Sequence, residues 1–336
     1  MKTSYINNRR YLGNKYKLLP FIQKVVDENC KDIKIVADLF AGTGAVSSVF
    51  IDKILITNDL LYSNYIANLA WFGSEIYDEK KIIEFINLYN NLSNLKENYM
   101  SENFADTYFS RENCMKIGFI RDDIELNFKN KKINERERAI LITSLLYAMD
   151  KIASTCGHYD AYRKNGNLNQ ILELAFLKAN LKNNPKNQIY NTDINVIAKD
   201  IKADLIYLDP PYNSRQYCDA YHLLENVAKW EKPKVFGTAK KMNRDDIKSD
   251  YCTVKAEIAF ADLIANLNSK YILLSYNNTA KKANERSNAK ISDEVILNLL
   301  KSRGKVEIFE TDYKAFTTGK SKNLENKERL FLCKIS

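Results

Sequence analysis

The sequence predicts an α/β fold in which a mostly parallel, Rossmann-like sheet carries an inserted helical segment. Three observations predict it. Apolar runs typical of buried strands alternate with helical patterns at both ends of the chain. Four of those runs end at an aspartate, at the edge where open α/β sheets bind their ligands. Between residues 71 and 186 the strand rhythm disappears and helical periodicity replaces it.

The composition is typical of a soluble protein with a polyanionic partner. The 336 residues carry a net charge of +9, although their richness in Lys, Asn, Ile and Tyr makes charge alone weak evidence. Six scattered cysteines without a Cys-x-x-Cys pair, and only two histidines, argue against a zinc site or a disulfide framework, so no metal is expected. The N-terminus lacks a signal-peptide core and the longest apolar stretch, 139–149, is too short to cross a bilayer, so we expect a cytoplasmic protein.

The first 30 residues predict a turn followed by a helix. The Gly13-Asn14 pair marks the turn, and an apolar stripe at helical spacing runs from Leu18 to Val26. The start of a helix has free N–H groups and, with Lys15 beside it, suits a carboxylate. A basic helix packed on a sheet explains the stripe equally well, but it does not explain the tight turn with its lysine.

Two strand-turn units come next, and both strands end in an acid. Residues 33–38 form a strand, a glycine turn at 42–44 lets the backbone pass close to a ligand, and residues 45–50 form a helix. The third glycine of the dinucleotide pattern is absent, so a pyrophosphate is not the obvious ligand. The second strand, 54–59, ends at Asp59, which suits two ribose hydroxyls. One strand-end aspartate is more often a helix cap, but two in consecutive units favour a nucleoside site.

Helical periodicity dominates the middle of the chain, at 82–88, 115–128 and 135–152. The last of these helices begins after Asn134, a capping residue. The polar and aromatic loop 154–164 follows it. That loop could read base edges or could be a mere surface connection, and the sequence alone leaves both interpretations open.

A rigid loop follows the strand 204–208, the next strand after 188–193. Asp209 precedes two prolines. Each proline ring fixes φ at about −65° and removes a backbone donor, so the hydrogen bonds between strands cannot continue past Asp209. The Asp209 carboxylate and the Pro210 carbonyl can accept both hydrogens of a planar amine while the ring of Tyr212 stacks on it. The alternative is a strand-ending turn whose aspartate caps the next segment of the chain.

The C-terminal part of the sequence predicts three further strands and one helix. Residues 271–278 form a strand and 295–300 a helix, and the last strands, 305–309 and 329–335, form a hairpin with an antiparallel strand at the sheet's edge. The basic segment 232–248 is expected to contact phosphates.

Together these motifs resemble the S-adenosylmethionine-dependent DNA adenine methyltransferases of the alpha (Dam-like) group, particularly methylases of type II and type IIS restriction systems. The motifs are Tyr-Leu-Gly-Asn-Lys at 11–15, Asp-Leu-Phe-Ala-Gly-Thr-Gly at 38–44, the tract 157–164, the segment 209–217 and Ser-Tyr-Asn at 275–277. The resemblance implies a class I methyltransferase sheet formed by 1–70 and 187–336, with 71–186 as a helical target-recognition insert. It implies S-adenosyl-L-methionine as cofactor, and double-stranded DNA and a cognate restriction endonuclease as partners, with no membrane.

The resemblance also implies roles for single residues. The catalytic residues are Asp209, Pro210, Pro211 and Tyr212. The cofactor contacts are Tyr11, Lys15, Asp38, Phe40, Gly42, Gly44, Asp59, Asp193 and Asp209. The nucleic-acid contacts are Arg9, His158, Tyr159, Arg163, Lys164, Arg215, Gln216, Tyr217, Lys240, Lys241 and Arg244. His158 and Arg163 stand where family members are more often apolar, which leaves the DNA target open.

The expected reaction moves a methyl group to the exocyclic 6-amino group of an adenine flipped out of duplex DNA. The enzyme mainly supplies alignment, because the sulfonium is already activated. Related alternatives are methylation of RNA adenine, of the cytosine amino group or of a protein glutamine, whose enzymes usually carry Ser or Asn where Asp209 stands, except some RNA enzymes. A catalytically silent DNA-binding module of the same fold is the alternative outside enzymes, and the intact Asp59, Asp209 and glycine turn count against it.

Overall fold

A seven-stranded sheet forms the frame of the protein, in the order β5-β3-β2-β6-β7-β9-β8. The computed structural model describes residues 2–6, 11–277, 290–312 and 327–335. The strands of the sheet are β5 (Gln188–Tyr190), β3 (Ile54–Asn58), β2 (Ile35–Asp38), β6 (Lys202–Leu208), β7 (Asn268–Asn277), β9 (Lys327–Ile335) and β8 (Gly304–Asp312), and β1 (Thr3–Ser4) pairs separately with β4 (Phe176–Leu177). Neighbouring strands from β5 to β7 are parallel, so the predicted α/β fold with a mostly parallel sheet is confirmed.

The central strands β2 and β6 bring two of the predicted motifs together. They run parallel, with Asp38 of β2 opposite Tyr207 of β6. Val36, Leu205 and their neighbours along both strands are buried, as in a parallel sheet covered by helices on both faces. The loops that follow β2 and β6 therefore leave the sheet side by side at its carboxyl edge.

The predicted C-terminal hairpin of β8 and β9 is confirmed, but the prediction that its antiparallel strand lies at the edge of the sheet is wrong. β9 pairs antiparallel with both β7 and β8, and β8 is the edge strand. The side chains explain this order. Residues 328–333 of β9 are all buried, as expected of a strand with a neighbour on each side, whereas the residues of β8 whose burial is described are partly or fully exposed.

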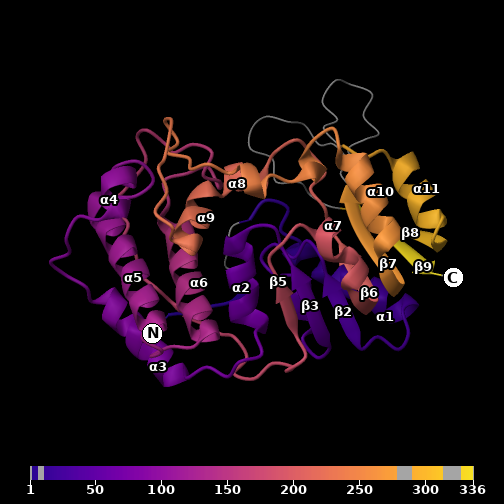
Figure 1. Ribbon diagram of the computed structural model, residues 1–336, viewed down its shortest axis with the longest axis horizontal. Coiled ribbons are helices and arrows are strands. Elements are labelled where there is room, and N and C mark those ends of the chain that lie inside the picture. Colours follow the sequence, from indigo (N-terminus) through magenta and orange to yellow (C-terminus); the bar gives the residue numbers. More distant parts are fainter. Residues whose placement is uncertain (1, 7–10, 278–289, 313–326, 336) are drawn as a thin grey trace.

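Helices cover both faces of the sheet (Figure 1). One face packs against α7 (Ile194–Ile197), α10 (Ala256–Asn266) and α11 (Asp293–Lys301). The other face packs against α1 (Leu19–Asn29) and α2 (Tyr62–Phe72). Beyond α2 lies a helical layer made of α3 (Glu79–Asn90), α4 (Tyr99–Phe104), α5 (Arg111–Lys129), α6 (Glu135–Ile152), α8 (Tyr217–Ala220) and α9 (His222–Lys229).

The helices predicted from their periodicity, α1, α3, α5, α6 and α11, are confirmed, and α6 begins at its predicted cap. The Glu137 N–H donates to Asn134 Oδ1 at 2.8 Å, and the Asn134 N–H donates to Glu137 Oε2 at 2.9 Å. The helix predicted at 45–50 is wrong, because only the 3₁₀ turn Ser47–Phe50 forms there. Valine and serine are weak helix formers, and β3 begins at Ile54, too soon for further turns.

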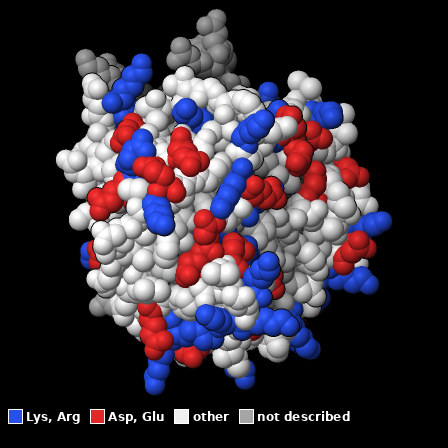
Figure 2. All heavy atoms as spheres, turned by 60° about the vertical axis from the view of Figure 1, so that its left-hand side comes forward, with Lys and Arg blue, Asp and Glu red and all other residues white. Residues whose placement is uncertain are grey.

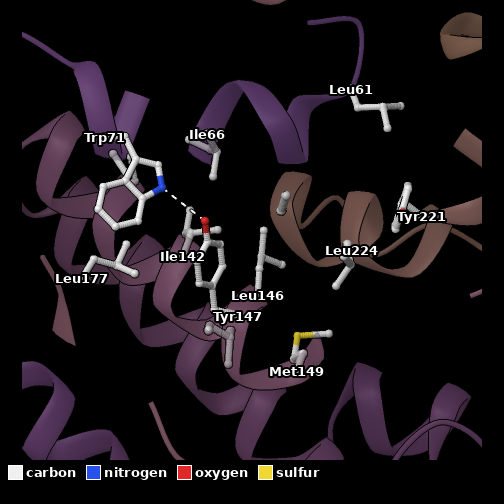
Figure 3. Packing of buried hydrophobic residues seen from close by; sticks show 14 of the residues in the cluster. Leu61, Ile66, Trp71, Ile142, Leu146, Tyr147, Met149, Leu177, Tyr221 and Leu224 are labelled. Atoms are coloured by element: carbon white, nitrogen blue, oxygen red, sulfur yellow. Dashed lines mark hydrogen bonds between the residues drawn. The ribbon is translucent and has the colours of Figure 1, made fainter. Parts of the chain in front are cut away.

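One hydrophobic cluster joins the sheet to the helical layer. Figure 3 shows its centre, where α2 lies against α6 and Trp71 Nε1 donates to the Tyr147 hydroxyl at 3.2 Å. Leu177 of β4 and Leu224 of α9 belong to the same cluster, as does Val36 of the sheet. On the outside of this layer, Lys and Arg are interspersed with Asp and Glu (Figure 2). Among the described residues, no helix has both the length and the apolar character needed to cross a membrane.

Candidate active site

A cavity opens at the carboxyl edge of the sheet, where the loops after β2, β3, β5 and β6 meet. Its empty volume, together with the open solvent at its mouth, is about 970 Å³. The strand-end aspartates Asp38, Asp59, Asp193 and Asp209 all line it. The other predicted residues that line it are Tyr11, Lys15, Phe40, Gly42, Pro211, Gln216 and Tyr217.

The glycine turn between β2 and the 3₁₀ turn has a left-handed backbone at two positions. Gly42 has φ of 53° and Gly44 has φ of 80°. A Cβ atom at Gly44 would lie 2.7 Å from the Phe72 ring, and one at Gly42 would lie 3.2 Å from the Tyr11 ring. Gly42 therefore lets the turn approach the cavity closely, while Gly44 lies behind the turn and packs against α2.

Asp38 places an acceptor without a donor at the cavity. Its side chain is buried, and the Ser47 hydroxyl donates to Oδ2 at 2.8 Å. Among the described residues nothing donates to its buried Oδ1. Burial raises the pKa of Asp38 to about 7; the Ser47 hydrogen bond opposes this shift, and the carboxylates of Asp209 and Asp59 add to it. A buried acceptor of this kind suits a ligand that brings a hydrogen-bond donor or a positive charge.

Asp59 fixes the glycine turn to the start of α2. Its Oδ2 accepts the Gly42 N–H at 2.8 Å, and its Oδ1 accepts the Leu61 N–H at 2.9 Å and Asn64 Nδ2 at 3.1 Å. The carboxylate therefore has a structural task in addition to its place in the cavity wall. Asp193 has a similar double position, since it lines the cavity and accepts the Asn195 N–H at 3.0 Å at the start of α7.

Asp209, directly after β6, forms an ion pair with Lys15. Lys15 Nζ lies 2.9 Å from Asp209 Oδ1 and 2.8 Å from Oδ2, and the lysine side chain is 7% exposed. Burial lowers the pKa of Lys15, but the charges of Asp209 and Glu328 and the hydrogen bond to Asp209 together raise that pKa above its usual value. Burial raises the pKa of Asp209 above its usual value, while the charge of Lys15 and its hydrogen bond oppose this shift. Asp209 lines the cavity, where its oxygens can accept hydrogen bonds.

Stacked tyrosines form the wall above the N-terminal turn. The Tyr11 ring stacks on Tyr221 at 4.7 Å and lies 5.6 Å from Tyr217. The Tyr221 hydroxyl accepts the Leu12 N–H at 2.6 Å, which ties the residues before α1 to α8 and α9. Tyr212 is half-buried, with its ring 6.2 Å from that of Tyr276.

The predicted nucleic-acid contacts differ in how far they are exposed to solvent. Arg163, Lys164 and Arg215 are exposed, and His158 and Lys240 are half-buried. Arg9 lies outside the described residues.

Two predicted cations have carboxylate partners within the protein. Lys241 lies 3.0 Å from Asp160 and 3.3 Å from Asp219, and Arg244 Nε lies 2.8 Å from Asp219. Tyr159 is 2% exposed and donates to Asp150 Oδ1 at 2.9 Å, so its ring lies in the core. Gln216 and Tyr217 face the cavity instead of the exposed surface.

Sequence reasoning missed several residues of the cavity. Leu12, Asn58, Thr192 and Tyr207 line it beside predicted residues, and Tyr221 supports it from behind by stacking on Tyr11. Tyr221 stands four residues after Tyr217, and this helical spacing was a signal that could have found it. Ile247, Ser249 and Tyr251 also line the cavity, but they lie in a polar segment without a recognisable motif. Within the described ranges, no three His, Cys, Asp or Glu side chains are grouped so that they could hold a metal ion.

Comparison with known proteins agrees with this geometry. The family model of the D12 class N6 adenine-specific DNA methyltransferases matches residues 11–287. The chain belongs to this family. Members of the D12 methyltransferase family take their methyl group from S-adenosylmethionine.

Individual D12 relatives differ in length. The modification methylase StsI of Streptococcus sanguinis is 36% identical over 343 residues, and the type II methyltransferase M.FokI of Planomicrobium okeanokoites is 33% identical over 342 residues. Each alignment covers 96% of this chain but 51% of the relative, so the chain spans about half the length of these two proteins. The type II methyltransferase M.NlaIII of Neisseria lactamica is 31% identical over 336 residues, and the alignment covers 94% of this chain and 95% of that protein.

Proposed function

We propose that this chain transfers a methyl group from S-adenosylmethionine to the exocyclic 6-amino group of an adenine in double-stranded DNA. The observation that carries the proposal is the position of Asp209. Its carboxylate lies on the same cavity as the glycine turn and Asp59, and Lys15 fixes its position through an ion pair. Family membership supports the same reaction.

The residues of the cavity fit the proposed cofactor. S-adenosylmethionine supplies an activated methyl group on a positively charged sulfonium. Gly42 lets the backbone approach the cofactor, the free Oδ1 of Asp38 suits a ligand of positive charge, and Asp59 suits ribose hydroxyls. Tyr11, Lys15, Phe40 and Asp193 complete the proposed contacts.

Asp209 and Pro210 prepare the adenine amine. The amine is a poor nucleophile because its lone pair is delocalised into the ring. When the Asp209 carboxylate and the Pro210 carbonyl accept its two hydrogens, the nitrogen moves toward tetrahedral geometry and its lone pair becomes available. Pro211 stiffens the loop, and the ring of Tyr212 stacks on the base, which offsets part of the few kcal/mol that flipping costs.

DNA recognition is assigned to the helical side of the molecule. In this proposal the insert 71–186 reads the target sequence, and exposed cations such as Arg163, Lys164 and Arg215 contact phosphates. The class I methyltransferase domain then consists of 1–70 and 187–336. Since relatives include modification methylases and type II methyltransferases, a restriction endonuclease with the same target sequence is the expected partner.

Sequencing DNA from cells that express the chain, with a modification-sensitive method, tests the proposal. The expected result is N6-methyladenine at one short sequence motif. Asp209→Ala should abolish this signal while the purified protein stays folded, and the exposed Asp200→Ala is the matched control that should leave it intact. Methyl groups on cytosine, or only in RNA, would assign the chain to another amino-methyltransferase class.

A further inference from the structure

The segment 247–251 forms a wall of the cavity although it lies outside every motif of the sequence. Ile247, Ser249 and Tyr251 line the cavity, and Ile247 and Tyr251 are buried. The segment consists of short turns and contributes no strand to the sheet. Such a segment needs contacts with its neighbours to keep a fixed position.

Gln216 supplies two of those contacts with one side chain. Its Nε2 donates to the Ser249 carbonyl at 2.9 Å, and its Oε1 accepts the Ser249 N–H at 2.8 Å. The Gln216 amide therefore bonds both the N–H and the carbonyl of Ser249, as a neighbouring strand would. The Cys252 thiol donates to the Arg215 carbonyl at 3.3 Å. Two adjacent residues of the loop after Asp209, Arg215 and Gln216, therefore hold this part of the chain in place.

Tyr251 connects the same wall to two other strand ends. Its ring meets the Phe40 ring edge-on, with centroids 5.0 Å apart, just after β2. Its hydroxyl donates to Asn195 Oδ1 at 2.8 Å, just after Asp193 and β5. The segment therefore bridges the carboxyl ends of β2, β5 and β6, three of the four strands whose ends form the cavity.

We infer that the segment 247–251 is a wall of the cofactor site and that Gln216 is the positioning residue that holds it. The inference rests on the proposed function, because it takes the cavity as the site of S-adenosylmethionine. It replaces the sequence-based expectation that Gln216 contacts nucleic acid. The Gln216 amide acts on the cofactor through Ser249 and Tyr251, and the wall supplies apolar surface from Ile247 and Tyr251.

Calorimetric titration with S-adenosylmethionine and steady-state kinetics with duplex DNA test the inference. Gln216→Ala should weaken cofactor binding about tenfold, as expected when hydrogen bonds that hold a binding wall are lost. The KM for the cofactor should rise in parallel while the KM for DNA changes less than about twofold. The exposed Gln23→Ala on α1 is the matched control and should behave as the wild type.

A second variant guards against a folding defect at Gln216. Tyr251→Phe keeps the ring against Phe40 and removes only the hydroxyl that reaches Asn195, so it should weaken cofactor binding by about threefold and again spare the KM for DNA. If Gln216→Ala raises the KM for DNA and leaves cofactor binding unchanged, Gln216 belongs to the DNA interface and the inference is wrong. If both variants bind the cofactor as the wild type does, the wall has no such role. A wild-type protein that binds no S-adenosylmethionine would overturn the proposed function, and the inference with it.

Discussion

At the scale of residues, the four positions 209–212 have different surroundings. Asp209 is held by Lys15 at the cavity, and Pro210 is buried. Pro211 lines the cavity, whereas Tyr212 is half-buried beside Tyr276 and its carbonyl accepts the Lys290 N–H at 3.0 Å. A ring at the margin of the cavity can stack on a base that enters from outside, but it can also serve only to pack the loop.

Variants of Tyr212 separate these two roles. If the ring stacks on a flipped adenine, Tyr212→Ala should slow single-turnover methylation roughly 5- to 150-fold, since base–aromatic stacking is worth about 1–3 kcal/mol. Tyr212→Phe and Tyr212→Trp should stay near the wild type, and the melting temperatures of all three should be similar. A lower melting temperature for Tyr212→Ala alone would indicate a packing role, and a Phe variant as slow as the Ala variant would make the hydroxyl the working group.

His222 predicts a pH dependence of stability. It is fully buried, and because a carbonyl only accepts, its Nε2 must carry the proton that is donated to the Tyr159 carbonyl at 2.8 Å. Burial lowers the pKa of His222 to about 4, and the charges of Lys241 and Arg244 add to that effect, while the bond to Tyr159 opposes it. In the unfolded chain the pKa is about 6.5, so the unfolded state binds the proton first as the pH falls.

The free energy of unfolding should therefore be at its full value above about pH 6.5 and fall toward pH 4, by on the order of 3 kcal/mol from this residue. Urea titrations across this range measure it. His222→Gln should be less stable at pH 7 but lose less stability on acidification, because its side chain does not titrate. An equal loss in both proteins would assign the acid sensitivity to other groups.

At the scale of elements, the sequence predicts strands whose apolar runs end sharply and helices that have one apolar face. The strands ending at Asp38, Asp59 and Asp209 were predictable because buried apolar runs stop at polar loops, and α6 was predictable from its stripe and cap. The helix α2 was missed. Most of its residues are buried, so it has no polar face to reveal a helical period, and its N-cap, Leu61, makes no side-chain capping bond.

The missing cap of α2 comes from α9, 163 residues later in the sequence. Glu225 is fully buried and accepts the Tyr62 N–H at 2.9 Å and the Ser63 N–H at 2.8 Å. These are free donors at the positive end of a helix, which is where a carboxylate is most favourable. No reading of neighbouring residues could have found this contact, just as none could have found the wall 247–251.

Glu225→Ala should lower the free energy of unfolding by about 2–4 kcal/mol, because it leaves buried N–H groups without an acceptor. Glu225→Gln keeps one acceptor oxygen and should lose less. Chemical denaturation measures both, with the exposed Glu231→Ala of the same region as the control. Equal stability of Glu225→Ala and Glu231→Ala would show that α2 does not depend on this contact.

At the scale of the whole molecule, the chain enters and leaves the helical layer through two adjacent connections. Arg136 is fully buried and donates to the carbonyls of Ala70 and Asn180 at 3.3 and 2.6 Å, and Asn183 Nδ2 donates to the Trp71 carbonyl at 2.9 Å. These contacts join the two ends of the segment 71–186, for which the sequence predicts helices because the strand rhythm is lost there.

The helical layer nevertheless contains more than that segment. Arg121 of α5 is fully buried and donates to the Val227 carbonyl of α9 at 2.7 Å, and the ring of Trp230, just after α9, lies 5.5 Å from its guanidinium. The helix α9 was missed because it is short and lies in a mostly polar stretch. If the helical layer reads DNA as proposed, the unit to exchange therefore includes 217–246 as well as 71–186, and the wall 247–251 stays in place.

Domain exchange with M.NlaIII, a relative of similar length, tests this larger unit. A chimera that receives both 71–186 and 217–246 from the relative should keep the contacts between α5, α6 and α9 and should methylate the relative's target sequence. A chimera that receives only 71–186 should be less stable, since the foreign α5 would then meet the Val227 carbonyl and the Trp230 ring of the original chain. Melting temperatures and modification-sensitive sequencing of both chimeras provide the measurements. If the larger chimera is active and keeps the original target sequence, recognition lies in the remaining residues of the catalytic sheet and its loops.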